Sequence, residues 1–307
     1  MKLTIATRGS QLALWQAEHV RDRLLSLDPT LEIELNIIKT QGDKILDVSL
    51  AKIGGKGLFV KEIETALLEK EADLAVHSMK DMPAELPEGL GLVAILDRED
   101  PRDAFVSNKY KSIAEVPAGG VVGTSSLRRA SQLLKNYPIE TALLRGNVNT
   151  RLAKLDNGDY DAIILAAAGL IRLGFEERIA ESLDPDGFIP SPGQGAVGVE
   201  CRVDDERVCA LLAQLNDDVT SARVAAEREF NLAIGGSCQV PAGCHVTVAD
   251  DQYEMKAFVA SPDGVKYFRA EKKGLFSELK GEGTIIANAL LEQGADQVLK
   301  DLLGKDI

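Results

Sequence analysis

The sequence predicts an α/β protein of two lobes joined by two chain crossings, followed by a small C-terminal α+β domain. Apolar runs of strand length alternate with stretches of helical periodicity from residue 3 to residue 234. Two stretches dense in charge or in proline and glycine, 97–103 and 190–195, interrupt this alternation and are typical of crossings between lobes. From Cys244 onward, period-two runs joined by turn residues indicate an antiparallel sheet.

Composition bounds the class of protein. With 307 residues, 45% of them hydrophobic and 27% charged, the chain is expected to be globular, with two or three domains. A net charge of −13 argues against a nucleic-acid partner or an anionic membrane. No apolar run is long enough to span a membrane, and the N-terminus lacks the pattern of a signal peptide. We therefore expect a cytoplasmic protein whose four cysteines are reduced thiols.

The first lobe begins with a strand at residues 3–7 and a helix that Ser10 is placed to cap. Its further elements are a strand over 31–38, a half-buried helix over 58–70, a buried strand over 72–78 and an apolar run over 91–96. Between them, residues 40–57 are rich in lysine and glycine. Lys56 is followed by Gly57 rather than by Ser or Thr, so we reject a nucleotide-binding loop. A mobile basic lid and a merely exposed loop both fit these residues.

Asp81 is the strongest candidate catalytic residue. It follows the buried strand 72–78 within the run His77-Ser78-Met79-Lys80-Asp81, and Pro83 prevents an easy continuation of the strand. In open α/β sheets, the carboxyl ends of strands deliver side chains to the ligand crevice. The alternative for Asp81 is a surface ion pair with Lys80.

The second lobe repeats this pattern of strand, turn and helix. A strand over 119–123 runs into Thr124-Ser125-Ser126-Leu127-Arg128-Arg129, where hydroxyls and arginines at a helix start indicate an anion site. Capping by Ser125 or Ser126 with solvated arginines is the alternative. Arg145 to Arg151 forms a similar turn, and 161–170 reads as a buried strand.

The remaining chain returns to the first lobe and then changes character. We expect a strand over 196–201, helices over 204–216 and 220–234, strands over 244–249, 253–260 and 265–272, and a helix over 283–303 broken at Gly294. Cys238 lies on a loop of glycines and a proline, where it could be a nucleophile or a covalent anchor. A small buried core residue is the alternative reading of this cysteine.

Cations recur at the ends of the predicted strands and the starts of the helices: Arg8, Lys80, Arg128, Arg129, Arg145 and Arg151. An acidic protein that concentrates cations at its crevice is suited to a small polyanionic ligand. The guanidinium group in particular matches the geometry of carboxylates. Asp81 would be the lone acid in this basic pocket, where it could bind ligand N–H groups or stabilise a cation formed during a reaction.

Five motifs resemble those of the porphobilinogen deaminases, which are also called hydroxymethylbilane synthases. They are His77-Ser78-Met79-Lys80-Asp81-Met82-Pro83, Gly123-Thr124-Ser125-Ser126-Leu127-Arg128-Arg129, Leu144-Arg145-Gly146-Asn147-Val148, Gly193-Gln194-Gly195-Ala196 and Cys238-Gln239-Val240-Pro241. The resemblance covers essentially the whole chain in the right order. It implies two lobes like those of type II periplasmic binding proteins and a third domain that carries the cofactor. We place the first lobe at 1–98 and 196–216, the second at 99–195 and the third at 217–307.

The resemblance also implies the reaction and its residues. Four porphobilinogen molecules would be joined head to tail with loss of ammonia to give hydroxymethylbilane, starting from a dipyrromethane primer attached through Cys238. Asp81 matches the catalytic position. The implied cofactor-binding residues are Lys80, Asp81, Thr124, Ser126, Arg128, Arg129 and Gly146, and the implied substrate-binding residues are Arg8, Ser10, Arg145, Arg151, Arg172 and Gln194. A mobile loop would include Lys52, Lys56 and Phe59, and no metal is expected. From the family we also expect a monomer that hands its product to the next enzyme of the pathway.

Two rival functions remain at this point. A non-catalytic two-lobe binding protein for a small polycarboxylate would explain the cations, but it gives Asp81 and Cys238 no role. A thiol- or metal-dependent regulator would use Cys238, Cys244 and His245, although their spacing fits no common zinc motif. The chain also departs from many relatives at Ser237, where they have glycine before the anchor cysteine.

Overall fold

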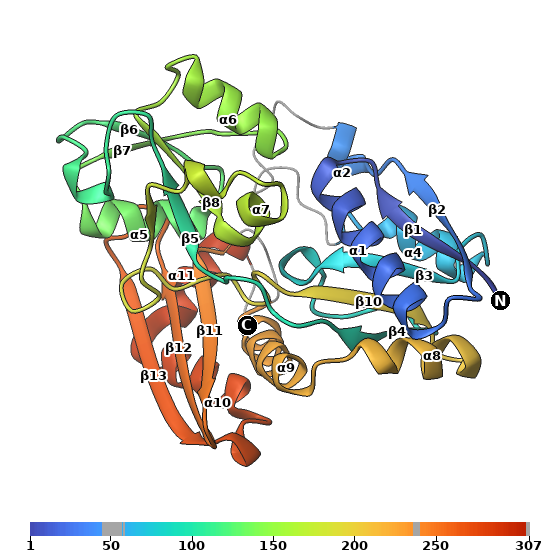
Figure 1. Cartoon of the computed structure of the whole chain (residues 1–307). Coiled ribbons are helices and arrows are strands. Elements are labelled where there is room, and N and C mark those ends of the chain that lie inside the picture. The colour runs from blue at the N-terminus through green and yellow to red at the C-terminus, as the bar shows by residue number, and fades with distance from the viewer. Residues whose placement is uncertain (45–56, 58, 236–239, 305–307) are drawn as a thin grey trace.

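The computed structural model describes residues 1–44, 57, 59–235 and 240–304, and it contains three sheets (Figure 1). The five-stranded sheet of the first lobe has the order β2-β1-β3-β10-β4. Its strands are β1 (Lys2–Arg8), β2 (Glu32–Ile38), β3 (Leu74–Ser78), β4 (Leu90–Ile95) and β10 (Val197–Arg202). β1 runs parallel to β2 and β3, whereas β10 is antiparallel to both of its neighbours. The first-lobe helices are α1 (Gln11–Leu27), α2 (Gln41–Lys44) and α4 (Lys61–Leu68).

The sheet of the second lobe has the order β7-β6-β8-β5-β9. Its strands are β5 (Asp103–Val106), β6 (Val121–Gly123), β7 (Glu140–Ala142), β8 (Ala162–Ala166) and β9 (Glu181–Ser182). Its helices are α5 (Leu127–Asn136), α6 (Val148–Asp156) and α7 (Ala167–Arg172), with short 3₁₀ turns at Ile113–Glu115 (η2) and Glu176–Arg178 (η3). In each sheet, three parallel strands are followed by one antiparallel strand that enters from the other lobe. The two lobes are therefore built on the same topology, as the recurring sequence pattern predicted.

The third sheet is antiparallel, with the order β11-β12-β13, and helices complete a small α+β domain. Its elements are β11 (Ala242–Ala249), β12 (Gln252–Ala260), β13 (Tyr267–Leu275), η5 (Phe276–Glu278), α10 (Glu282–Leu290), η6 (Leu291–Ala295) and α11 (Asp296–Leu303). Before it, β10 is followed by α8 (Glu206–Leu212), η4 (Ala213–Leu215) and α9 (Asp218–Ala233). Figure 1 shows α9 between the first lobe's sheet and the antiparallel sheet. The domain boundaries after residues 98, 195 and 216 stay predictions.

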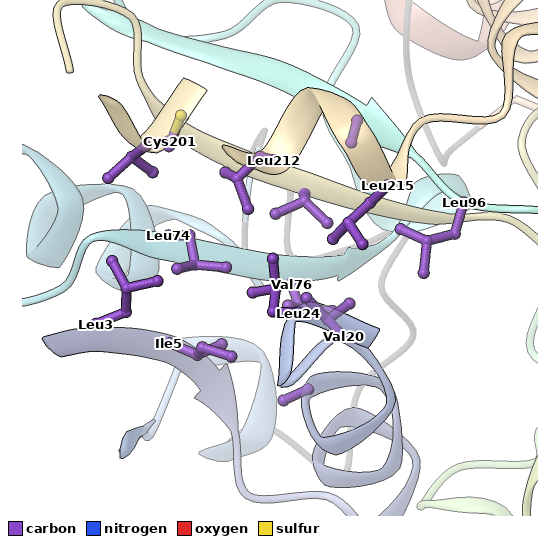
Figure 2. Close-up of a cluster of buried hydrophobic side chains, with 14 of the residues drawn as sticks. Leu3, Ile5, Val20, Leu24, Leu74, Val76, Leu96, Cys201, Leu212 and Leu215 are labelled. Carbon is purple, nitrogen blue, oxygen red and sulfur yellow. The ribbon is translucent and has the colours of Figure 1, made fainter. Parts of the chain in front are cut away.

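The first-lobe core lies between α1, α8 and one face of the sheet (Figure 2). Alternate residues of β1 and β3, such as Leu3 and Ile5 or Leu74 and Val76, turn to this face and meet Val20 and Leu24 of α1. This arrangement follows from the two-residue period of a strand and the helical spacing of α1.

The structure corrects two details of the sequence reading. The apolar run 161–170 is not one strand, because β8 ends at Ala166 and α7 begins at Ala167. A fully buried run has no periodicity to separate strand from helix. In the sequence the apolar residues of the half-buried helix over 58–70 include Leu68, but α4 spans only Lys61–Leu68 and Leu68 is 47% exposed. The helix break at Gly294 is confirmed, with a φ of 108° at that residue.

Within the described part of the chain, no helix has both the length and the apolar character needed to cross a membrane.

Candidate active site

Asp81 lies on an anchored turn at the end of a central strand. β3 ends at Ser78, and Met79–Asp81 (η1) follows as a single 3₁₀ turn. The Met79 side chain is buried, and its atoms occupy the space that a Cβ at Gly193 or Gly198 would need. Because Met79 is locked against these two glycines, the turn is held in place and leaves Asp81 exposed.

Cations from both lobes lie around Asp81. Burial lowers the pKa of Lys80 to about 8, and Asp81 opposes this shift while Arg129 of the second lobe adds to it. Burial lowers the pKa of Arg151 to about 10. Arg129 and Arg145 lower the pKa of Arg151 further, whereas Asp81 opposes them. Since neighbouring charges shift a pKa only at short range, these side chains lie within electrostatic range of one another across the two lobes.

Arg128 and Arg129 are held from within the protein by Asp103, the first residue of β5. Nη1 and Nη2 of Arg128 donate to Oδ2 and Oδ1 of Asp103 at 2.7 and 3.0 Å, and Nε of Arg129 donates to Oδ1 at 2.9 Å. Burial would raise the pKa of Asp103, but the two arginines outweigh it and hold that pKa well below its usual range. Two cations share one carboxylate, so one positive charge is left over for an anionic ligand.

The alternative reading of these arginines is half correct. Ser126 does cap α5, since its Oγ accepts a hydrogen bond from the Arg129 N–H at 3.4 Å. The arginines themselves are not solvated, because Arg128 is 5% exposed and Arg129 is 7% exposed. Buried guanidinium groups beside a helix N-terminus are a stronger anion site than solvated ones.

Gln194 joins the two crossings to the arginines. Its Nε2 donates to the carbonyl oxygen of Pro101 at 2.7 Å and lies 3.1 Å from Oδ1 of Asp103. Its Oε1 accepts from Nη2 of Arg129 at 3.5 Å. The crossings also pair directly, with the Glu99 N–H donating to the Gly195 carbonyl at 3.2 Å. A change in the angle between the lobes would therefore reach Arg129 through Gln194.

The turn that carries Arg145 and Arg151 depends on a glycine. Gly146 has a φ of 119°, and a Cβ there would meet Cγ2 of Thr150 at 2.7 Å. The Gly146 carbonyl accepts from Nε of Arg151 at 2.8 Å, and Asn147 caps α6 by accepting from the Thr150 N–H at 2.9 Å. The turn thus fixes the stem of Arg151 relative to the helix start.

The predicted hydroxyl residues all lie at helix starts that follow strands. Ser10 caps α1, as the sequence predicted, with Oγ accepting from the Ala13 N–H at 3.3 Å. Oγ1 of Thr124 accepts from the Ser126 N–H at 3.2 Å. Helix starts of this kind present N–H donors to anions, so these positions are suited to ligand carboxylates.

Arg8 and Arg172 lie against aromatic rings. Cζ of Arg8 is 4.2 Å from the centre of the Phe59 ring, and Gly42 leaves the space that this ring fills. Arg172 of α7 lies over the Trp15 ring of α1 at 5.4 Å, and its Nη2 donates to the Gly195 carbonyl at 2.7 Å. Arg172 therefore bridges the two lobes in addition to any contact with a ligand. Lys52, Lys56 and Cys238 lie outside the described residues.

A buried ion pair that the sequence reading missed joins the crossings to the third domain. Nη1 and Nη2 of Arg98 donate to Oε1 and Oε2 of Glu227 at 2.7 and 3.0 Å. The same carboxylate accepts from the backbone N–H groups of Gly193 and Val246, and Nδ1 of His245 lies 3.3 Å away. The sequence offered one signal of this ion pair, which is an acidic residue, Glu227, on the buried face of a predicted helix. Its partners could not be predicted, because they are more than 15 residues away along the chain.

The described residues contain no group of three His, Cys, Asp or Glu side chains that could hold a metal ion. His245, which the regulator hypothesis would use as a ligand, faces Glu227 instead.

Two family models together match most of the chain. Residues 3–210 match the family model described as the dipyrromethane cofactor binding domain of porphobilinogen deaminase, and residues 221–292 match that of the porphobilinogen deaminase C-terminal domain. Among solved structures, similar chains include a TRAP periplasmic solute binding protein from Desulfovibrio salexigens (10% identity, 70% of this chain and 72% of that chain, TM-score 0.43). Others are an arginine-specific periplasmic binding protein from Salmonella typhimurium (13%, 72% and 93%, 0.40) and the L-cystine receptor of Neisseria gonorrhoeae (14%, 74% and 90%, 0.39).

Proposed function

The chain belongs to the porphobilinogen deaminase family, and from this premise we propose how it works as a hydroxymethylbilane synthase. It condenses four porphobilinogen molecules head to tail, releases ammonia at each step, and frees the linear tetrapyrrole with water. The observation that carries this proposal is the exposed carboxyl of Asp81 among cations of both lobes.

The donor set fits the dipyrromethane cofactor of the family. Each pyrrole of cofactor and substrate carries carboxylate side chains, and the site offers guanidinium, ammonium and helix-start N–H donors that suit them. In this proposal Cys238 is the covalent anchor of the cofactor. The residues that bind it are Lys80, Asp81, Thr124, Ser126, Arg128, Arg129 and Gly146. When bound, the cofactor supplies a nucleophilic pyrrole carbon from which the chain grows.

The remaining cations position the substrate. The residues that bind the carboxylates of porphobilinogen are Arg8, Ser10, Arg145, Arg151, Arg172 and Gln194. Lys52, Lys56 and Phe59 belong to a loop that covers the site. Arg151 is the strongest candidate of this set, because the charge of Asp81 contributes to its pKa, which supports a position near that carboxylate. Holding each ring by its carboxylates brings the aminomethyl carbon within reach of the attacking carbon.

Asp81 acts on the substrate as charge stabiliser and proton carrier. When ammonia leaves the aminomethyl group of porphobilinogen, positive charge develops on the methylene carbon and spreads to the pyrrole nitrogen. A fixed carboxylate at that nitrogen stabilises the charge as it forms. The same carboxylate can take up the proton that is lost when the ring regains aromaticity.

The lobes, the oligomeric state and the cellular setting complete the proposal. The two crossings act as a hinge that makes room for the lengthening chain, with the first lobe at 1–98 and 196–216, the second at 99–195 and the third at 217–307. The enzyme works as a cytoplasmic monomer and passes its product to the next enzyme of the pathway. No specific observation favours the rival binding protein, since it leaves Asp81 without a role.

The test measures the turnover of porphobilinogen by the variant Asp81→Asn. Turnover is monitored through the release of ammonia. We expect the rate to fall about 10²–10⁴-fold, as for loss of a positioned acid–base group, while the covalently bound cofactor is retained. Asp22→Asn is the matched control, because Asp22 is an exposed acid of the same lobe, and its rate should be unchanged. Near-normal turnover by Asp81→Asn would remove Asp81 from its proposed role.

A further inference from the structure

Cys201 and Cys209 bring two thiols into contact in the first lobe. Their Sγ atoms lie 3.6 Å apart, whereas the sulfur atoms of a disulfide are about 2.05 Å apart. Cys201 lies on β10 opposite Leu74, at the end of the strand far from the active site. At the other end of β10, Val197 pairs with Ser78, just before the turn that carries Asp81. The thiol pair is therefore separate from the proposed catalytic machinery.

The elements that carry the two thiols are fixed against each other. Cys209 lies on α8, which Asp205 caps by accepting from the Val208 N–H at 3.1 Å. Between the strand and the helix, Nη1 of Arg202 donates to the carbonyl oxygens of Leu67 and Ala72, each at 2.7 Å. Because both ends of the connection are anchored, the two sulfur atoms stay near each other. Figure 2 shows Cys201 in the same core cluster as Leu212 of α8.

The two thiols differ in accessibility. Cys201 is fully buried, whereas Cys209 is half-buried at the edge of the core. Burial raises the pKa of Cys201 to about 12, and its hydrogen bond with Cys209 adds to this shift. Since an oxidant in solution can approach Cys209 but not the fully buried Cys201, Cys209 is the sulfur that it reaches first. Cys209 is also in contact with the Arg202 carbonyl, to which its S–H donates at 3.4 Å, so the Cys201 thiol is the one that donates to Cys209.

We propose that Cys201 and Cys209 are a redox-active thiol pair that hydrogen peroxide converts reversibly into an intramolecular disulfide without loss of enzyme activity. The Cys209 sulfur attacks the peroxide, the O–O bond breaks, and a sulfenic acid and one water form. The Cys201 sulfur then attacks the Cys209 sulfur, forming the S–S bond. The hydroxide of the sulfenic acid leaves the Cys209 sulfur. It combines with the proton of the Cys201 thiol to form a second water. The two sulfur atoms supply the two electrons that reduce the peroxide, and a thiol reductant returns them.

Cys244 provides an internal comparison. It is fully buried on β11, and burial together with the charge of Glu227 raises its pKa well above its usual range. Among the described cysteines, Cys201 and Cys209 form the one pair with sulfur atoms in contact. The same oxidant should therefore leave Cys244 as a free thiol.

The test is oxidation of the purified holoenzyme with hydrogen peroxide, followed by denaturation, alkylation of free thiols and mass spectrometry. Before alkylation, we expect the oxidised protein to be lighter by about 2 Da, the two hydrogens lost per disulfide. A joined peptide pair should contain Cys201 and Cys209, and two fewer thiols should be alkylated. Treatment with a phosphine reductant should reverse the change, and turnover of porphobilinogen should be the same before and after oxidation.

Two single variants complete the test. Cys209→Ser should show no 2 Da loss on oxidation, whereas Cys244→Ser should lose it as the wild type does. The absence of a joined Cys201–Cys209 peptide from the oxidised wild type would overturn the proposal, as would consumption of Cys244 in their place. Loss of turnover on oxidation in the wild type but not in Cys209→Ser would overturn the claim that the disulfide leaves the active site intact. The joined peptide and the number of alkylated thiols do not depend on the attachment at Cys238.

Discussion

Asp103 and Arg128 form a buried ion pair in which two guanidinium nitrogens donate to the two carboxylate oxygens, at 2.7 and 3.0 Å. Arg129 and Gln194 bind the same carboxylate. One acid of the second lobe thus orients two of the arginines that we assign to the cofactor and ties them to the crossing between the lobes. It also neutralises part of their charge, so that they can be buried without a ligand.

The first prediction concerns this carboxylate. Asp103→Asn should lower the free energy of unfolding by about 3–5 kcal/mol, because removal of one partner of a buried ion pair leaves uncompensated charge. The measurement is urea denaturation of the variant beside the wild type. Asp97→Asn is the control, because Asp97 pairs with Arg23 at the surface with 70% of its side chain exposed, and its effect should be within about 0.5 kcal/mol. Equal effects of the two substitutions would contradict the internal role of Asp103.

A second prediction concerns Glu227. Burial would raise its pKa, but Arg98 and His245 outweigh burial and hold it well below the ordinary value of 4.5. A carboxyl whose folded-state pKa is depressed stabilises the fold fully above its unfolded-state pKa, and this contribution is lost as the pH falls below it. We therefore expect the free energy of unfolding to fall between about pH 5 and pH 3, with a shallower fall in Glu227→Gln.

The control for this pH profile is Glu229→Gln on the same helix. Glu229 accepts from the backbone N–H of Gly281 and is half-buried. This variant should keep the slope of the wild type between pH 5 and pH 3, since the Arg98–Glu227 pair is intact. A wild-type slope in Glu227→Gln would show that the acid sensitivity comes from other carboxyl groups.

Much of the fold could be predicted from the sequence because its signals are local. Ser10 was identified as a helix cap from its place after a strand, capping by Ser125 or Ser126 was an alternative reading, and Gly294 marked a break in a helical run. The repeated strand, turn and helix pattern indicated two similar lobes. The prediction of a single strand over 161–170 was wrong, because burial on all sides removes the periodicity that distinguishes a helix from a strand.

The partners of buried charges could not be predicted in the same way. The stretch 97–103 was correctly interpreted as a crossing, but nothing in it separates the exposed Asp97 from the buried Arg98 and Asp103. Which charge turns inward depends on partners 25 and 129 residues away along the chain, Arg128 for Asp103 and Glu227 for Arg98. The sequence after this stretch gives one signal that Asp103 is buried, because Asp103 directly precedes the fully apolar segment Ala104-Phe105-Val106.

A third prediction uses the single tryptophan of the chain, Trp15. Its ring lies under Arg172 of the other lobe, so a change in the angle between the lobes will alter its surroundings. We expect the Trp15 fluorescence of the holoenzyme to change as porphobilinogen is added and the chain lengthens. In Asp81→Asn, whose turnover should be about 10²–10⁴-fold slower, the change that accompanies elongation should be slowed by the same factor. The same change in both proteins would assign the signal to binding rather than to motion of the lobes.

The central claim is that a two-pyrrole primer, anchored on the sulfur of Cys238, begins the chain that Asp81 helps to extend. The most direct test is the intact mass of the purified protein. The account predicts a mass above that of the sequence by two linked pyrrole units, an excess that is lost in Cys238→Ser and kept in Cys244→Ser. An unmodified wild-type protein that still converts porphobilinogen, or an excess mass that persists in Cys238→Ser, would contradict it.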